Sequence, residues 1–104
     1  MGVGDASRDS TVLAFDFGTR RIGVAVGDLA TRIAHPLATI EREREAERFG
    51  AIASLVAEWK PARLVVGLPV HADGTPHGTT ARAQRFGRQL AGRTGLPVEF
   101  ADER

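Results

Sequence analysis

Hydrophobic residues recur along this chain at two spacings, which together predict five strands and two helices. Short apolar segments bounded by turn residues are typical of strands. The predicted strands are Thr11–Phe17, Arg21–Asp28, Arg32–Ile40, Arg63–Leu68 and Pro97–Ala101. Apolar residues at helical spacing predict helices over Glu41–Lys60 and Thr79–Thr94, with a loop over Pro69–Gly78. Three consecutive strands followed by two strand–helix–strand crossovers predict an α/β fold with a mixed five-stranded sheet.

The second predicted strand separates large side chains from small ones. Its two sets of alternate residues are Ile22, Val24 and Val26 against Gly23, Ala25 and Gly27. The large set is suited to a core, whereas the small set lets a helix or a substrate backbone approach closely. In the third strand, Pro36 predicts a sheet edge or a bulge, because proline cannot donate a ladder hydrogen bond.

Length and composition indicate a single domain without disulfides. The chain has 104 residues, of which 42% are hydrophobic and 26% charged, and it contains no cysteine. Disulfides, thiolate metal sites and cysteine catalysis are therefore excluded. We expect residues 1–10 to be a disordered lead and residues 11–104 to form the domain. No segment has the roughly 20 apolar residues of a membrane span, so we expect no membrane partner and a cytoplasmic location.

Candidate chemistry centres on Asp16, a carboxylate near the end of the apolar segment Thr11–Phe17. A nearly continuous apolar strand is typically covered on both faces, so the carboxylate would need a partner, a proton or a cation. Gly18 permits a tight turn, and Thr19 and Arg20 place a hydroxyl and a cation beside the charge. The alternative is a turn aspartate that accepts hydrogen bonds from the following amides.

A second acidic pair, Asp102 and Glu103, follows the last predicted strand. Ligands of open α/β sheets bind beyond the strand ends, so the pair would converge with Asp16 if the first and fifth strands lie close. Carboxylate oxygens favour Mg²⁺ or Mn²⁺, which can activate water and stabilise the leaving oxygen in phosphodiester cleavage. The alternative is an ordinary solvated terminus.

Charge is unevenly distributed, although the net charge is only +1. Arg82, Arg85 and Arg88 recur every three residues in the second predicted helix, without an acidic residue nearby. They predict either a solubilising face or a surface that contacts nucleic-acid phosphates. The run of alternating acids and arginines over residues 41–45 predicts a solvated helix face with pairs at i,i+3, such as Glu41 with Arg44.

The three histidines share no metal-ligand spacing. His35 lies in a predicted strand and is expected to be structural. His71 and His77 flank Asp73 in the loop that should face the crevice, so either could contact substrate.

Four motifs, in order, resemble the YqgF family of bacterial RNase H-like proteins. They are DFGTRRIGVAVGD, VVGLPVHADGT, TARAQRF and ADER, and the match runs from Val12 to Arg104. Members of this family are described as nucleases that mature the 5′ end of pre-16S rRNA or as Holliday-junction resolvases. The resemblance therefore implies an RNase H-like fold and a nucleic-acid partner.

The resemblance also implies roles for individual residues. Asp16 matches the first catalytic carboxylate, and Glu103 matches the acidic position after the last strand, with Asp102 as its alternative. His71 stands where the family usually has asparagine. The family continues into a helix with a further catalytic aspartate, whereas this sequence ends at Arg104. We therefore expect a fragment or truncated product with an incomplete metal site.

Together these observations predict a metal-dependent nuclease that hydrolyses phosphodiesters with water. Asp16 and Glu103 would hold Mg²⁺ or Mn²⁺. The expected substrate contacts are Gly18, Thr19, Arg20, His71, Asp73, Arg82 and Arg85. Pre-rRNA is the favoured substrate and branched DNA the alternative; a resolvase would be a symmetric dimer, so both monomer and homodimer remain open. Two further hypotheses are a non-catalytic RNA-binding module and an actin-like ATP-binding domain.

Overall fold

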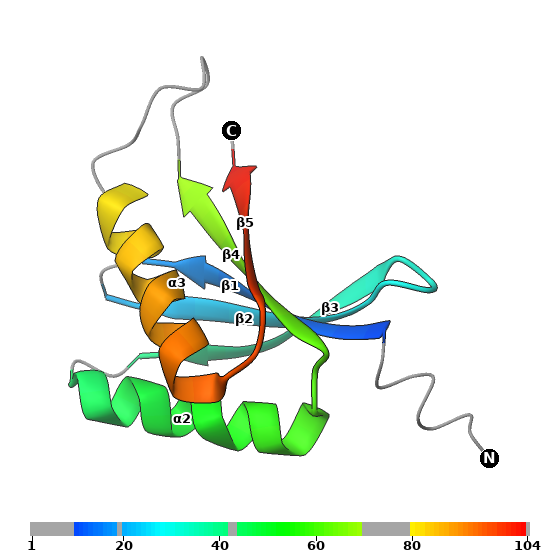
Figure 1. Ribbon diagram of the computed structural model, residues 1–104, viewed down its shortest axis with the longest axis horizontal. Coiled ribbons are helices and arrows are strands. Elements are labelled where there is room, and N and C mark those ends of the chain that lie inside the picture. Colours follow the sequence, from blue (N-terminus) through cyan, green and yellow to red (C-terminus); the bar gives the residue numbers. More distant parts are fainter. Residues whose placement is uncertain (1–9, 19, 42–43, 70–79, 104) are drawn as a thin grey trace.

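The computed structural model describes residues 10–18, 20–41, 44–69 and 80–103, which form one five-stranded sheet and two helices (Figure 1). The elements are β1 (Thr11–Phe17), β2 (Ile22–Asp28), β3 (Ile33–Ile40), α2 (Glu45–Trp59), β4 (Arg63–Pro69), α3 (Thr80–Thr94) and β5 (Val98–Glu103). None of the described helices is long and apolar enough to cross a membrane.

The strands are arranged in the order β3-β2-β1-β4-β5. β1 pairs antiparallel with β2, and β2 antiparallel with β3, which makes the predicted meander. β4 pairs parallel with β1 on one side and with β5 on the other. The mixed α/β sheet predicted from the sequence is confirmed, and β1 is its central strand.

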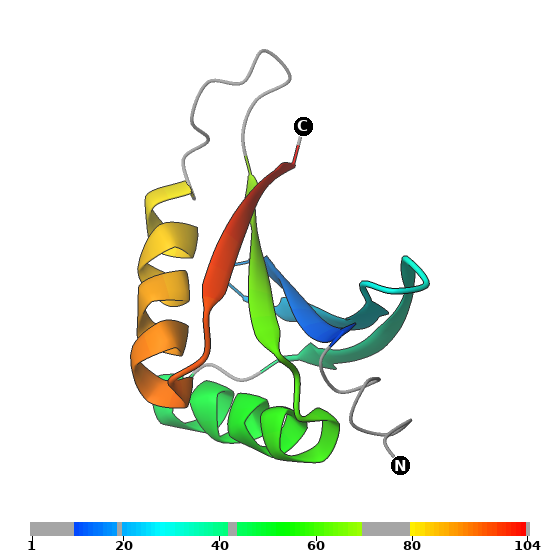
Figure 2. The same ribbon diagram turned by 45° about the vertical axis from the view of Figure 1, so that its right-hand side comes forward.

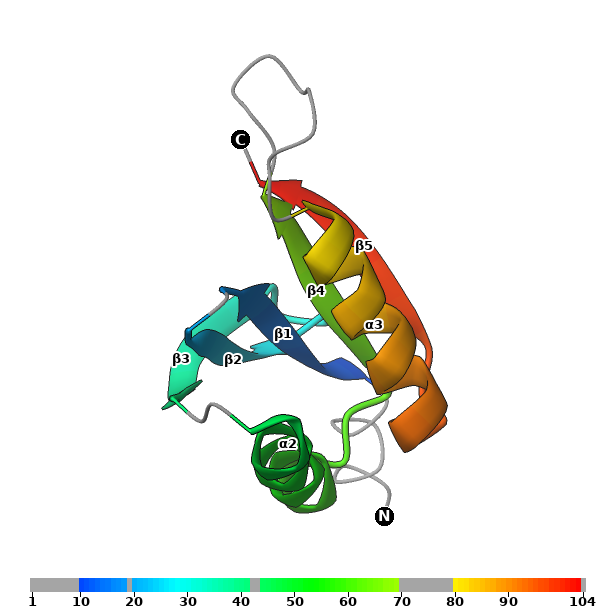
Figure 3. The same cartoon turned by 90° about the vertical axis from the view of Figure 1, so that its left-hand side faces the viewer.

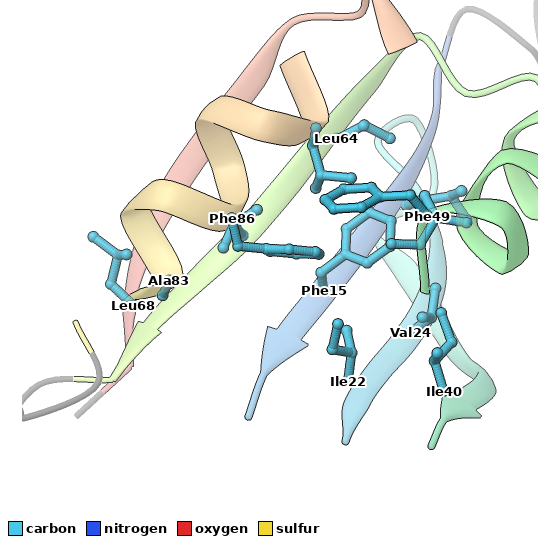
Figure 4. Packing of buried hydrophobic residues seen from close by; sticks show 13 residues of the cluster. Phe15, Ile22, Val24, Ile40, Phe49, Leu64, Leu68, Ala83 and Phe86 are labelled. Atoms are coloured by element: carbon cyan, nitrogen blue, oxygen red, sulfur yellow. The ribbon is translucent and has the colours of Figure 1, made fainter. Parts of the chain in front are cut away.

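Both helices cover the same face of the sheet (Figures 2 and 3). The core between them contains the large alternate residues of the strands, including Leu13, Phe15, Ile22, Val24, Leu64 and Val66. Phe86 of α3 lies at its centre, with ring centroids 5.8 Å from Phe49 and 5.9 Å from Phe15 (Figure 4). The ring centroid of Phe17 lies 5.0 Å from that of Phe86. The large face of β2 therefore faces the core, as its alternation predicts.

The opposite face of the sheet carries no helix within the described residues, which corrects one expectation. Asp16 was expected in a strand covered on both faces, but its side chain is exposed. Small residues alternate with the core residues here, so the run Thr11–Phe17 is apolar without being buried on both sides. No buried charge has to be compensated at Asp16.

Helix α2 begins four residues later than the charge pattern predicts. Ile40 still pairs with Ile22 in the β2–β3 ladder, and Arg44 has extended backbone angles (φ −78°, ψ 132°). Glu41 therefore precedes the helix, and its carboxylate lies 3.7 Å from the guanidinium of Arg21 instead of pairing along the helix with Arg44. At the other end, Lys60 takes a left-handed conformation and stops the helix before Pro61.

Helix α3 approaches β5 closely because residue 87 has no side chain. A Cβ atom at Gly87 would lie 2.4 Å from the ring of Phe100. Gly87 and the neighbouring Ala83 are both buried, so a small-residue patch on α3 receives this ring. Ala83, Phe86, Gly87 and Leu90 form the buried face of α3.

Strand β3 forms one edge of the sheet and is irregular at its proline. Ala25 pairs with Pro36, whereas the preceding Val24 pairs with Ala38, so the register shifts by one residue. The prediction of an edge or bulge at Pro36 is confirmed.

Candidate active site

Asp16 occupies the carboxyl end of the central strand with a glycine on each side. Its Cα partners are Gly23 in β2 and Gly67 in β4. Neither neighbour has a side chain that could cover the carboxylate, and the carboxylate forms no hydrogen bond or ion pair with the described residues. The alternative of a turn aspartate bonded to the following amides receives no support from the described part of the turn. The carboxylate is therefore open to a ligand.

Asp16 lines a shallow groove with a volume of about 400 Å³ on the uncovered face. Its lining comes from all five strands and consists mainly of small residues: Ala14, Gly23, Ala25, Ala38, Gly67 and Ala101 are among them. Gly23 and Ala25, from the small face of β2, thus line the groove and not the core. Asp16 is the one ionisable residue among the described residues that line the groove.

Strand β5 brings the second acidic pair to the carboxyl ends of β1 and β4, the end of the sheet at which Asp16 lies. Asp16 pairs with Gly67, and Gly67 pairs with Ala101, so the three residues form one row across β1, β4 and β5. Asp16 and Ala101 are therefore separated by two strand spacings, each of about 4.8 Å. Asp102 and Glu103 follow Ala101 within the strand, and not beyond its end as expected.

Alternation along β5 separates Asp102 from Glu103. Asp102 pairs with Leu68, a core residue, and therefore belongs to the helix face of the sheet. Glu103 pairs with Pro69 and occupies the register position two residues after Ala101, on the face of Asp16.

The turn after β1 is held by its backbone. The Gly18 N–H donates a hydrogen bond to the Arg21 carbonyl oxygen at 2.9 Å. A Cβ atom at Gly18 would lie 2.7 Å from that oxygen, so the turn has no room for a larger residue. Arg20 is exposed at the tip of this turn, near the carboxyl end of β1, whereas Thr19 lies outside the described residues.

The predicted arginine contacts lie on the other face of the sheet. Arg82 and Arg85 line a second pocket, between α2 and α3, together with Arg48, which was not among the residues predicted from the sequence. Arg88 does not line it. Arg48 was missed because it belongs to the mixed-charge run, and only the packing of α2 against α3 brings it beside the arginines of α3.

Other candidates are dispersed or not described. His35 is exposed on the edge strand β3, away from the Asp16 row, and His71, Asp73 and His77 lie outside the described residues. Among the residues the structure describes, no three His, Cys, Asp or Glu side chains are grouped as a metal site requires.

Comparison with known proteins identifies relatives with nuclease names. A family model described as "RuvX: Holliday junction resolvase" matches residues 10–104. A relative from Dechloromonas aromatica is 63% identical over 94 residues, which are 90% of this chain and 64% of that protein. One from Burkholderia lata is 56% identical over 101 residues, which are 97% of this chain and 68% of that protein. Both are named "Putative pre-16S rRNA nuclease".

Solved structures with lower identity share the fold. Pelota from Archaeoglobus fulgidus superposes with a TM-score of 0.60 at 16% identity, covering 97% of this chain and 28% of Pelota. RuvC from Thermus thermophilus, solved with a Holliday junction substrate, gives 0.57 at 18% identity and covers 88% of this chain and 64% of RuvC. The likeness to RuvC confirms the RNase H-like fold. The family model and the curated relatives together show that this chain belongs to the RuvX family, the YqgF family of the four sequence motifs.

Proposed function

We propose that this chain is the core of a metal-dependent nuclease that hydrolyses phosphodiester bonds at Asp16. The observation that carries this proposal is the exposed carboxylate of Asp16, flanked by two glycines in a groove of about 400 Å³. The nuclease names of the relatives support the same activity, although the chain spans only 64–68% of their lengths.

The donor set suits a hard divalent cation in part. Asp16 and the register position of Glu103 share one face and one edge of the sheet, and all-oxygen ligands favour Mg²⁺ or Mn²⁺. Asp16 and Glu103 would hold the ion, which when bound supplies an activated water and charge stabilisation for the leaving oxygen. Two carboxylates leave coordination positions of this ion to water and to phosphate oxygens of the substrate.

The remaining residues of the groove admit and position the substrate. Gly23 and Gly67 leave space for a phosphodiester to approach Asp16 without a side chain in between. Arg20, exposed on the following turn, would contact a phosphate oxygen of the same strand.

The 5′ end of pre-16S rRNA is the substrate we propose, on the names of the curated relatives. A four-way DNA junction is the second candidate, favoured by the description of the family and by the junction-bound RuvC structure. Incubating the chain with a 5′-extended 16S rRNA fragment and with a synthetic junction, in Mg²⁺ or Mn²⁺, separates the two. A junction enzyme should also be a dimer in solution, because the junction offers two equivalent strands.

Replacing Asp16 by asparagine tests the catalytic assignment. We expect cleavage to fall by at least about 10²-fold, since several kcal/mol of charge stabilisation would be lost. The fold and most of the nucleic-acid affinity should persist because Asp16 is exposed and makes no contact that supports the structure. Cleavage rates and thermal unfolding measure the two effects.

Glu99→Gln is the matched control for this substitution. Glu99 lies in β5 and, like Asp16, has an exposed carboxylate. It pairs with Arg63 at 2.7 Å, and the loss of its charge should leave cleavage intact. Cleavage by Asp16→Asn at the wild-type rate, in a preparation free of contaminating nuclease, would overturn the assignment.

A further inference from the structure

A pocket of about 260 Å³ lies between α2 and α3 on the helix side of the sheet. Three guanidinium groups, those of Arg48, Arg82 and Arg85, surround it. Its other lining residues are Phe17, Glu45, Phe49, Phe86 and Gln89. We call this the arginine pocket. Its lining carries three cations and one anion, so its net charge is positive.

The two helices hold the arginine pocket in a fixed shape. The Gln89 Nε2 group of α3 donates a hydrogen bond to the Glu45 carboxylate of α2 at 2.8 Å. The rings of Phe17 and Phe49 pack against the ring of Phe86, with centroids 5.0 and 5.8 Å from it. The guanidinium of Arg93 lies 4.2 Å above the Phe49 ring. The arginines therefore project from a rigid base.

The chemistry of the arginine pocket favours a phosphate group. Guanidinium forks match the oxygens of a phosphate, and clustered arginines recognise it widely. The volume of about 260 Å³ is below the usual range for sites that enclose a whole small molecule, about 300–1,000 Å³. A nucleobase would need an open aromatic face, but Phe49 and Phe86 are only 7% and 4% exposed.

The arginine pocket lies on the reverse side of the strand end that carries Asp16. Phe17 lines it, and Phe17 follows Asp16 directly in β1, with the two side chains on opposite faces. The ring of Phe86 in α3 lies 5.0 Å from the ring of Phe17, so α3 crosses the helix face of β1 near this end. A nucleic-acid strand that leaves the groove around the carboxyl end of β1 therefore reaches the arginines.

We infer that the arginine pocket holds a backbone phosphate of the nucleic-acid substrate that flanks the phosphodiester at Asp16. This inference rests on the proposed nuclease function for its substrate class, but it concerns binding and not cleavage. The proposed site is narrower than the whole row of arginines along α3, because Arg82 and Arg85 line the pocket and Arg88 does not.

Binding of a labelled single-stranded RNA, titrated with salt in the presence of EDTA, tests the pocket without cleavage. The double substitution Arg82→Gln, Arg85→Gln should weaken binding and reduce the slope of log K against log salt by about 0.7, the value for one phosphate contact on a single strand. Arg88→Gln removes a cation from the same helix outside the pocket and should leave the slope nearly unchanged. Glu45→Gln removes the anion of the pocket and should tighten binding.

Two outcomes would overturn the inference. If Arg88→Gln and Arg85→Gln weaken binding equally, the helix acts through its overall charge and not through a pocket. If a ribonucleoside monophosphate competes as well as the RNA, the pocket serves a small phosphorylated ligand. Because the assay needs no catalysis, retained cleavage by Asp16→Asn would defeat the nuclease assignment and leave the binding result standing.

Discussion

Alternation within β5 gives its last two acidic residues different surroundings. Asp102 shares a register position with Leu68 on the helix face, whereas Glu103 falls two residues after Ala101, which lies in the row of Asp16. The sequence presents the two acids as interchangeable neighbours. The pleat of the strand makes Glu103 the partner of Asp16 in our proposal.

Exchanging each acid for its amide separates these two positions. Glu103→Gln should reduce cleavage by at least about 10²-fold, as Asp16→Asn does, because a ligand of the proposed cation would be lost. Asp102→Asn should cleave at close to the wild-type rate. Initial rates at several Mn²⁺ concentrations measure both, and an inactive Asp102→Asn beside an active Glu103→Gln would contradict the register argument.

At the residue scale, the sequence predicted the position of Asp16 near the end of its strand but not its exposure. In the run Thr11–Phe17 only Leu13, Phe15 and Phe17 contribute to the core under the helices, and the average hydrophobicity of the run hides the difference between the two faces. Whether a face is covered depends on helices that lie far away in the chain. Local apolarity could therefore not distinguish a strand buried on both faces from a strand buried on one.

At the scale of the elements, Asp28 stabilises the turn between β2 and β3 by hydrogen bonds. Its Oδ1 atom accepts hydrogen bonds from the backbone N–H groups of Ala30 at 2.8 Å and Thr31 at 3.4 Å. The Ser10 side chain and these amides lower the pKa of the Asp28 carboxyl. The turn then closes through Arg32, which has a positive φ of 59° and donates its N–H to the Asp28 carbonyl at 2.7 Å.

The lowered pKa of Asp28 makes this turn sensitive to acid. The carboxylate stabilises the fold fully above its unfolded pKa of about 3.9, and this contribution is lost as the pH falls through the lower folded value. Asp28→Asn keeps a side-chain acceptor but no charge, so it should be less stable than wild type at pH 7 and approach it at pH 3. Urea unfolding at both pH values checks this, and an unchanged difference would contradict it.

Most elements could be predicted to within two residues, and the two larger errors have a common cause. The charged run 41–44 favours a helix locally, yet the pairing of Ile40 with Ile22 keeps the chain extended to that point. Asp102 and Glu103 are poor strand formers, yet pairing with β4 carries β5 through both of them. In each case a ladder with a distant strand overrides local propensity.

At the scale of the whole molecule, the two faces of the sheet should respond differently to substitution. Phe86 lies at the centre of the core, and Phe86→Ala should cost about 3–5 kcal/mol of unfolding free energy. Ala25 lines the groove, and Ala25→Val should change stability by no more than about 0.5 kcal/mol while reducing cleavage by obstructing the groove. Urea unfolding and cleavage rates test the pair; a large stability loss in Ala25→Val would show that this face is packed.

The arrangement of the sheet was only partly accessible from the sequence. The α/β class and the shared edge of the acidic residues followed from the order of the elements. The separation of Asp16 from Arg82 and Arg85 did not, because it depends on β4 joining β1 across about fifty residues and carrying α3 to the core face.

The irregularity at Pro36 has a consequence for self-association. Unpaired edge strands invite pairing with other chains, and the two described edges of this sheet resist it by different means. β3 does so through its proline and shifted register, which do not depend on pH. β5 does so through three acidic residues among its six, Glu99, Asp102 and Glu103. Replacing these acids by amides would therefore remove the protection of only one edge, so sheet-to-sheet aggregation of such a variant should begin at β5.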